Sequence, residues 1–598
     1  MRPRSLLVPV LVVLLGWGGL LAARARAGDR PKGEAKPSAR ADSVRSFTLP
    51  DVDGKAHALS DARGASAVVL AWTAPGCPVA EVYAPRLVEI ARRYAERGVR
   101  FYGVSSDAGR DVAELRALVR KHAIPYPLLV DADATLASRV SATTTTTVVV
   151  LDPNWRVRYR GAVDDQYDPK GRREKAEHEW LRDALEAILA SKAVAVEATE
   201  APGCPLTFPS REGASDANAP TWSGAAAAIV HARCATCHQP GTAAPFPLRS
   251  LADVAPRVAV LKAVIEEGRM PPWHAVPPAG VAFSNDRRLS ADERKTLLAW
   301  LDAGAPGGDP AKAPAPPPVV PPTAWEIGEP DAVFGFAAPE KVPAEGVVPY
   351  RFVEVKTDFP EDRWVAAVEV QPGAADVVHH VLGAVEPDGL RRRGAKMALF
   401  TPTSGFFAAM VPGGKAHVYP KGMAKKLPKG AKLLFQMHYT PSGVAREDTT
   451  RIGFRFFAGE PEREVKTAGA FNPAFEIPPG SADWEVKSLV PVPWNARILS
   501  YMPHMHLRGK SFRYLIMRPG HPDETILDVP AFDFNWQTPY RLATPQKVPK
   551  GAFLKCVAHF DNSDGNPYNP DPTATVHWGD QTWDEMMIGY VDYVIDPD

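Results

Sequence analysis

The chain has 598 residues, 45% hydrophobic and 23% charged, a balance that excludes a polytopic membrane protein and a mostly disordered chain. Its 70 Lys and Arg nearly cancel its 69 Asp and Glu, so charge gives no case for nucleic acid binding. Five cysteines are too few for a disulfide framework, whereas 61 prolines are about twice the usual share of roughly 5%. Each cysteine therefore needs its own explanation.

The first 27 residues have the pattern of a secretory signal peptide. A basic start precedes an apolar run over 6–23, and Ala25-Arg26-Ala27 places small residues at a cleavage position before Gly28. The apolar run is close to the roughly 20 residues that span a bilayer, so an uncleaved N-terminal membrane anchor is the alternative. We therefore expect an exported protein.

Residues 45–195 alternate between strand-like and helix-like patterns. Short apolar runs bounded by turn residues predict β-strands, and stretches with helical periodicity lie between and after them. The expected strands are 67–72, 99–104, 126–131 and 148–152, and the expected helices are 79–98, 111–124 and 177–192. Alternation of this kind predicts an α/β domain.

The rest of the chain divides by composition into a helical segment, a linker and a β region. Residues 222–305 end in a helix that is predicted to start at the N-cap Ser290, with Glu293 completing a capping box. In the linker 306–324, eight of the seventeen residues from 306 to 322 are proline, which is typical of an extended spacer. Strand-like runs then predict two all-β sandwiches, at 325–470 and 471–598.

The motif Cys234-Ala-Thr-Cys237-His238 is the attachment pattern of c-type haem. Two thiols one helical turn apart can both form thioethers with the haem vinyl groups, and His238 is then directed at the iron. A disulfide redox pair and half of a zinc site are the alternatives, but no nearby Cys or His pair completes a zinc site. Met270, before Pro271-Pro272, is the expected second axial ligand, with His274 as the alternative. Segment 222–305 resembles small all-α cytochrome c domains.

Histidines gather in the β region. His504 and His506 are two residues apart, so on a strand they point to one face and can bind one metal ion. The adjacent His379 and His380 would point to opposite faces, so binding one ion with both requires a bulge or a strand end. His438 follows in a later strand-like run. Imidazole suits copper and zinc, and an added thioether favours copper.

Residues 325–598 resemble the type II copper, ascorbate-dependent monooxygenases, the family of peptidylglycine α-hydroxylating monooxygenase and dopamine β-monooxygenase. The resemblance implies two jelly-roll sandwiches that each hold one copper ion. It places the electron-transfer copper on His379, His380 and His438. It places the catalytic, oxygen-binding copper on His504, His506 and Met586, the last in an Asp-Glu-Met segment.

The resemblance is incomplete. Gln436 and Tyr590 also match the family, but Met502 and Ile588 stand where the peptide-processing member has Arg and Asn. A peptide C-terminus is therefore a poor expectation for the substrate. The family's disulfides are also missing, because Cys556 is the only cysteine of this region, so we expect it to be a buried thiol.

Segment 45–195 resembles the thioredoxin-like superfamily, in particular redoxins of the peroxiredoxin and thiol-reductase type. Cys77 has the expected place between a strand and a helix, where a helix N-terminus can lower the pKa of a thiol. Ala80 replaces a resolving cysteine, and residues 142–147 lack the usual proline. Three interpretations of Cys77 stay open: a structural or slow disulfide with Cys204, a single-cysteine peroxidatic site, and a degenerate scaffold.

These features lead to one main hypothesis and two alternatives. The main hypothesis is an exported copper monooxygenase that hydroxylates an unknown small-molecule or peptide substrate with O₂. A fused haem c would relay electrons from an ascorbate-like reductant or a periplasmic cytochrome. The alternatives are a haem and copper electron-transfer or copper-handling protein, and a thiol redox protein acting through the redoxin domain. The arrangement resembles multidomain exported proteins of Gram-negative bacteria, which implies the periplasm, with membrane contact only if the signal stays uncleaved.

Overall fold

A computed structural model describes residues 43–597 except 45, 169–170, 174, 210–218, 322, 387–404, 413 and 415. The expected signal peptide, residues 1–27, lies outside the described residues. Among the helices that the structure describes, none is both long enough and apolar enough to cross a membrane.

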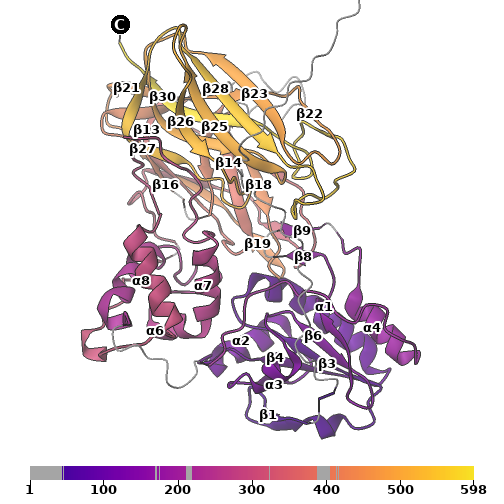
Figure 1. The fold of residues 1–598 in the computed structure, drawn as a ribbon. Coiled ribbons are helices and arrows are strands. Elements are labelled where there is room, and N and C mark those ends of the chain that lie inside the picture. Colours follow the sequence, from indigo (N-terminus) through magenta and orange to yellow (C-terminus); the bar gives the residue numbers. More distant parts are fainter. Residues whose placement is uncertain are drawn as a thin grey trace, which may run out of the picture. The chain divides into compact units, whose positions relative to one another are not determined.

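The N-terminal part is the expected α/β domain, drawn in indigo to violet in Figure 1. A five-stranded sheet has the order β5-β4-β3-β6-β7. Strands β3, β4 and β5 run parallel to one another, and β6 runs antiparallel to its two neighbours, β3 and β7. Its elements are β1 (Thr48–Pro50), β2 (Ala56–Ala58), β3 (Ala67–Trp72), α1 (Pro78–Ala95), β4 (Val99–Ser105), α2 (Val112–His122), β5 (Leu128–Val130), α3 (Thr135–Val140), β6 (Val148–Leu151), β7 (Val157–Gly161), β8 (Tyr167–Asp168), β9 (Gly171–Arg172) and α4 (Trp180–Leu189). The four expected strands and three expected helices are confirmed.

Helices cover both faces of this sheet because its central strands are apolar on both sides. Helices α1 and α4 pack on the face that contains Val69 and Val150, and α3 packs on the face that contains Val68 and Leu70. The domain continues beyond the expected boundary at residue 195. The chain returns to the sheet through bridges that pair Arg160 with Ala198 and Thr144 with Pro205. This return holds Cys204 against the domain.

Residues 222–305 are helical, as expected. Their elements are a π-helical turn (Trp222–Ala226), α5 (Ala227–Arg233), α6 (Leu251–Val254), a 3₁₀ turn (Ala255–Arg257), α7 (Val258–Glu266) and α8 (Ala291–Asp302). The Ser290 hydroxyl accepts from the Glu293 amide, and the Glu293 carboxylate accepts from the Ser290 amide, so the predicted capping box is confirmed. The stretch 273–285 leaves the helices: Trp273 and Phe283 pack in the core of the C-terminal sandwich.

The C-terminal part is all β: one nine-stranded sheet and two four-stranded sheets make two pairs of facing layers (Figure 1, salmon to yellow). The first pair contains β10 (Ala332–Gly335), β12 (Arg351–Lys356), β13 (Arg363–Gln371), β14 (Val378–Glu386), β15 (Phe406–Met410), β16 (Ala416–Val418), β17 (Met423–Leu427), β18 (Lys432–Tyr439) and β20 (Arg451–Phe456), with β11 (Glu340–Val342) pairing β19 (Arg446–Asp448) beside it. The second pair contains β21 (Arg463–Phe471), β23 (Trp484–Pro491), β24 (Ala496–His504), β25 (Gly509–Met517), β26 (Glu524–Val529), β27 (Tyr540–Val548), β28 (Phe553–Phe560) and β30 (Ile588–Ile595), and β22 (Glu476–Ile477) pairs β29 (Val576–His577).

The two sandwiches share one sheet. Strand β17 of the first pairs in parallel with β21, and β21 pairs with β30 of the second, so nine strands are continuous. The second sandwich therefore begins at β21, before the expected boundary at 470/471. An apolar cluster that includes Leu382, Met502 and Met586 also fills the space between the sandwiches. The histidine-bearing strands β14, β18 and β24 are thus parts of one body.

Candidate functional site

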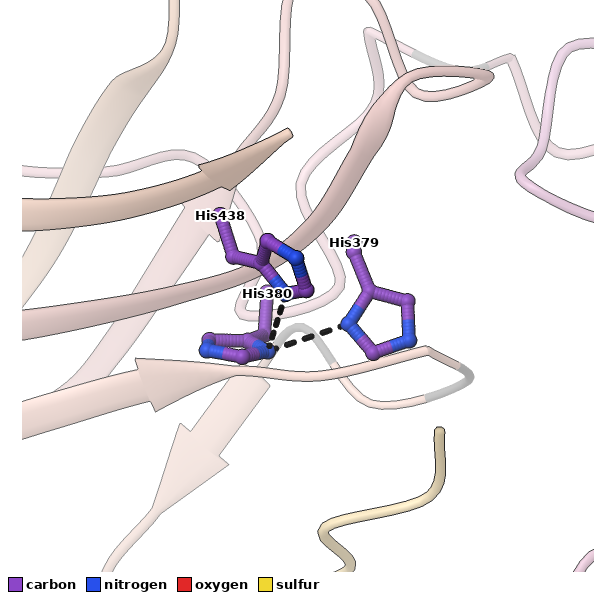
Figure 2. Close-up of side chains that lie close together, drawn as sticks. All are labelled: His379, His380 and His438. Carbon is purple, nitrogen blue, oxygen red and sulfur yellow. Dashed lines mark hydrogen bonds between the residues drawn. The ribbon is translucent and has the colours of Figure 1, made fainter. Parts of the chain in front are cut away.

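Three of the predicted histidines meet at the ends of β14 and β18 (Figure 2). His380 pairs directly with His438 across the two strands, while the register shifts between Val378 and His380. His379 is therefore the extra residue of a β-bulge, and the bulge turns it to the same side as His380. One donor atom from each of His379, His380 and His438 lies within 4.8 Å of the others.

The spacing of these nitrogens fits a shared metal ion. The Nδ1 atom of His380 is 3.0 Å from Nδ1 of His379 and 3.4 Å from Nδ1 of His438. Two nitrogens bound to one ion at about 2.0–2.1 Å lie about 2.9 Å apart at a right angle and about 3.4 Å apart at the tetrahedral angle. Facing lone pairs at such distances need a shared proton or a shared cation, so the donor set fits copper or zinc.

The buried environment keeps His380 neutral. Burial, followed by the neighbouring His438 and His379, holds the pKa of His380 well below its ordinary value. The Nε2 atom of His380 is buried without a hydrogen-bond partner among the described residues. Neutral imidazoles carry the lone pair that a metal ion requires, so no proton has to be displaced from His380 at neutral pH.

The second predicted cluster lies where β24 ends. The Nδ1–H of His504 donates to Gln537 Oε1 at 2.5 Å, and the Nδ1–H of His506 donates to the Asp584 carbonyl at 3.2 Å. These acceptors assign the lone pair of each ring to Nε2. The His506 Nε2 atom is buried without a partner among the described residues, and burial lowers the pKa of His504 to about 4 and of His506 to about 3. Both rings are therefore neutral, and each keeps a lone pair that a metal ion can bind.

Glu585 fastens this histidine loop to the segment that carries Met586. Its Oε2 atom accepts the amide of His506 at 2.8 Å and that of Met586 at 3.3 Å, and its Oε1 atom accepts the amide of Arg508 at 2.6 Å. Met586 is 1% exposed. Glu585 thus holds the backbone of His506 and Met586 in place, as hydrogen bonds around metal ligands do in proteins.

The two clusters share two aromatic walls. The ring centroid of Tyr350 is 5.0 Å from that of His438, 5.8 Å from that of His380 and 6.1 Å from that of His506. The Phe534 ring centroid is 5.6 Å from that of His438 and 6.3 Å from that of His506. Tyr350 precedes β12 of the first sandwich, and Phe534 lies between β26 and β27 of the second. Both clusters therefore line one region between the sandwiches.

The Cys234–His238 motif forms a turn that directly follows α5. The amides of Cys237 and His238 donate to the carbonyl of Cys234 at 3.1 and 2.9 Å, which places the two thiols one turn apart, as haem attachment requires. The Nδ1–H of His238 donates to the Phe246 carbonyl at 2.9 Å. Because this bond occupies Nδ1, Nε2 is left for iron, and the donor set fits a c-type haem.

The two candidates for the second axial ligand lie in different surroundings. The Met270 amide donates to the Val264 carbonyl of α7, so Met270 stays with the helical segment. His274 is held by the C-terminal sandwich: Tyr540 bonds its backbone, and burial, opposed by the charge of Asp533, lowers its pKa. This placement favours Met270 over His274.

Cys77 and Cys204 are side by side. Cys77 precedes α1 and is 2% exposed, and its Sγ atom lies 3.0 Å from the Thr145 hydroxyl. Thr145 in turn accepts the Cys204 amide at 2.9 Å, and its own amide donates to the Cys204 carbonyl at 2.9 Å. The segment after the domain thus supplies the second thiol that position 80 lacks.

Hydrogen bonds divide the roles of the two thiols. Burial disfavours a Cys77 thiolate, but hydrogen bonds from the Cys204 thiol, the Thr145 hydroxyl and the Ala80 amide outweigh it and lower the pKa of Cys77. The hydrogen bond to Cys77, and then burial, raise the pKa of Cys204 well above its ordinary value. These shifts favour a thiolate at Cys77 and a protonated thiol at Cys204. Cys556 is buried, as expected, and burial raises its pKa.

Several site residues do not stand out in the sequence. Gln537, Phe534 and Tyr350 come from loops far from the histidines that they contact, and nothing in their local pattern marks them. Thr145 has a weak signal, since the run of threonines from 143 to 147 occupies the loop that faces the thiol in redoxins. Glu585 has a better one, because it directly precedes the predicted ligand Met586.

Comparisons with known proteins concern the N-terminal domain. The family model described as AhpC/TSA family matches residues 41–160. No curated protein matches the chain. A hypothetical protein from Sinorhizobium meliloti shares 24% identity (28% of this chain, 94% of that chain, TM-score 0.27). A peroxidoxin from Mycobacterium tuberculosis shares 23% (25% and 95%, TM-score 0.20), and a secreted disulfide oxidoreductase of that organism shares 25% (19% and 79%, TM-score 0.17). The chain contains a thioredoxin-like redoxin domain.

Proposed function

We propose that this chain is an exported, periplasmic thiol–disulfide oxidoreductase that acts through Cys77 and Cys204. The observation that carries the proposal is the placement of Cys204 beside Cys77, with the Thr145 hydroxyl bonded to both residues, inside a domain that matches the AhpC/TSA family. The lowered pKa of Cys77, which hydrogen bonds from Cys204 and Thr145 cause against burial, supports it. Of the three interpretations of Cys77, this favours the pairing with Cys204, expected as a structural or slow disulfide, over a single-cysteine site or a degenerate scaffold. We propose that the pair is reactive rather than structural.

The two thiols fit the two steps of exchange. The Cys77 thiolate attacks one sulfur of a substrate disulfide, a mixed disulfide forms, and the other sulfur leaves as a thiolate. The Cys204 thiol then loses its proton and attacks Cys77, which releases the second substrate sulfur and leaves a Cys77–Cys204 disulfide. Two electrons and two protons thus pass to the substrate, and a thiol reductant is needed to restore the pair.

Disulfide mapping tests this function. The reduced full-length protein is treated with oxidised glutathione, alkylated and digested, and we expect a Cys77–Cys204 link to form first. In Cys204→Ala, the mixed disulfide of Cys77 with glutathione should accumulate, whereas Cys556→Ala should behave as the unchanged protein. If Cys77 stays alkylatable while the reagent is consumed elsewhere, the proposal fails.

A second function is favoured by the histidine clusters. We propose that the β region binds two copper ions, one on His379, His380 and His438 and the other on His504, His506 and Met586, and acts as a monooxygenase. The supporting observation is that two sets of imidazoles line one region behind Tyr350 and Phe534. Bound copper would supply one-electron redox chemistry and O₂ binding.

The residues of the chain would contribute orientation and exclusion of water. Gln537 and the Asp584 carbonyl fix the tautomers of His504 and His506, and Glu585 fixes the loop that carries them. A haem on Cys234, Cys237 and His238 would connect the site to an electron donor. The alternative within this proposal is electron transfer or copper handling without oxygenation.

Metal content separates these outcomes. The copper-loaded protein should hold two ions per chain, and His438→Ala should lose one, whereas the control His559→Ala should lose none because His559 faces Asp483 outside the clusters. O₂ consumption driven by ascorbate and lost in His504→Ala supports the monooxygenase. Two ions without O₂ consumption support copper handling, and no stoichiometric copper rejects both.

A further inference from the structure

The loop that carries Cys77 touches the segment that carries the haem-attachment motif. A Cβ atom at Gly76 would lie 3.0 Å from the Pro245 carbonyl oxygen and 3.0 Å from the Phe246 ring, so only glycine, here with a φ of +77°, allows the approach. Phe246 is the residue whose carbonyl accepts the His238 Nδ1–H. The thiol loop and the haem-attachment segment thus meet at one residue.

The segment that carries Cys204 touches the same helical segment. The Thr207 hydroxyl donates to the Pro256 carbonyl at 3.1 Å, while the Thr207 amide donates to Asp107 of the redoxin domain at 3.0 Å. The positive charge of Arg269, next to Met270, acts on the Cys204 thiol. The segments that carry both thiols of the pair therefore lie at this contact.

Two buried arginines and a partly exposed carboxylate form ion pairs at the contact. The Arg257 guanidinium, whose side chain is 4% exposed, lies 3.1 Å from the Glu114 carboxylate of α2 and 4.8 Å from the Phe246 ring centroid. Arg110, 5% exposed, reaches the Pro256 carbonyl and the same carboxylate. Separating the two segments would leave the buried Arg257 charge without its Glu114 partner, which disfavours other arrangements of the two segments.

The Cys234 and Cys237 thiols have a chemical requirement that this contact can meet. Thioether formation with haem uses free thiols, and two cysteines one turn apart readily close a disulfide in an oxidising compartment. We propose that the substrate of the Cys77–Cys204 pair is the Cys234–Cys237 disulfide of the same chain, which the redoxin domain reduces before haem attachment. This inference rests on the thiol function proposed above.

The exchange balances within the chain. The Cys77 thiolate attacks one sulfur of the Cys234–Cys237 disulfide, forms a mixed disulfide with it and expels the other sulfur as a thiolate, which takes up a proton. Cys204 then gives up its proton and attacks Cys77, which frees the second thiol. One disulfide breaks and one forms. The outcome is a Cys77–Cys204 disulfide and a reduced CxxCH motif.

Two features assist the encounter of the sulfurs. Residues 239–249, all described, form neither helix nor strand, so the haem-attachment side has few backbone bonds to break. Attachment of both partners to one chain also gives an effective concentration on the order of millimolar. The exchange rate should therefore not depend on protein concentration.

Trapping of the mixed disulfide tests the inference. In the haem-free full chain of Cys204→Ala, oxidised with one equivalent of diamide, we expect a link between Cys77 and Cys234 or Cys237 within one chain, at a rate that is unchanged over tenfold dilution. The matched control is Cys556→Ala, which retains Cys204. During export, Cys77→Ala should lower the haem bound per chain by about tenfold, and dithiothreitol in the medium should restore it.

The outcomes separate this inference from the function on which it rests. If Cys77 and Cys204 exchange with glutathione but no intrachain link to Cys234 or Cys237 forms, the inference is overturned and the thiol function stands. If the pair does not react with glutathione either, both are overturned. An unchanged haem content in Cys77→Ala, with the variant folded by circular dichroism, also contradicts the inference.

Discussion

His380 lies directly opposite His438 on the neighbouring strands β14 and β18, and their Nδ1 atoms are 3.4 Å apart. The bulge at His379 brings a third imidazole to the same side. In a regular strand His379 would point to the face opposite His380. The bulge therefore allows His379 to join His380 and His438 in one cluster. Because side chains alternate between the two faces of a strand, the sequence alone predicts that His379 and His380 can bind one ion only at a bulge or a strand end.

Gln537 should control metal binding at the second cluster. Gln537→Leu removes the acceptor of the His504 Nδ1–H and with it the bond that fixes the tautomer. Loss of such a bond typically lowers metal affinity by about 10–100-fold. Copper titration with a competing chelator measures the change. The control is Gln546→Leu, which removes a bond to Tyr501 instead; equal losses in both variants would contradict the role of Gln537.

Thr145 should determine how nucleophilic Cys77 is. Thr145→Val keeps the shape of the side chain and removes a hydrogen bond that stabilises the thiolate. A bond to a charged group contributes about 1.5–3 kcal/mol, so the pKa of Cys77 should rise by about one unit or more. The pH profile of Cys77 alkylation, followed by peptide mass spectrometry, measures the shift. Thr147→Val is the control, because its hydroxyl bonds the Thr144 carbonyl; a shift of the same size there would contradict the prediction.

Local patterns predicted the parts of the structure that depend on local physics. The strands and helices of the redoxin domain follow from periodicity, and the cap at Ser290 follows from its capping-box partner three residues later. The site walls depend on contacts over long sequence separations: Tyr350 meets His506 from the other sandwich, and Cys204 meets Cys77 from beyond the expected domain end. The pairing of β17 with β21, which joins the sandwiches, likewise leaves no periodic signal.

Tyr350 should couple the two histidine clusters. Tyr350→Ala would leave a cavity between His380, His438 and His506 at a cost of roughly 3–5 kcal/mol, and copper binding at both sites should weaken. Tyr350→Phe removes only a hydroxyl that is buried without a partner among the described residues, so stability should stay the same or rise slightly. Urea unfolding and copper titration measure the two effects.

A matched control distinguishes loss of the wall from loss of stability. Phe435 is 1% exposed in the core of the same sandwich, so Phe435→Ala should cost a similar free energy of unfolding. Its ring faces the core, so copper affinity at the second cluster should be retained. If Tyr350→Ala lowers the copper affinity of one cluster only, Tyr350 contributes to that cluster alone and the predicted coupling is wrong.

Glu585 should make stability fall as the pH rises. Burial raises its pKa to about 8, although the amides of Arg508, His506 and Met586 oppose the shift. The folded protein therefore holds a proton that the unfolded chain, with an ordinary pKa of about 4.5, releases between these values. The stabilisation is complete below pH 4.5 and is lost as the pH rises toward 8, by at most about 1.4 kcal/mol per pH unit.

Urea unfolding of the metal-free protein between pH 5 and 9 measures this slope, and Glu585→Gln supplies the comparison. Glutamine keeps an acceptor for the His506 and Arg508 amides but does not titrate, so the difference in unfolding free energy between the two proteins should change steadily up to pH 8 and then level off. Asp580→Asn is the control, since Asp580 is a less buried carboxyl of the same loop. A difference that does not vary with pH would mean that the three amides and the neighbouring Arg508 keep Glu585 ionised.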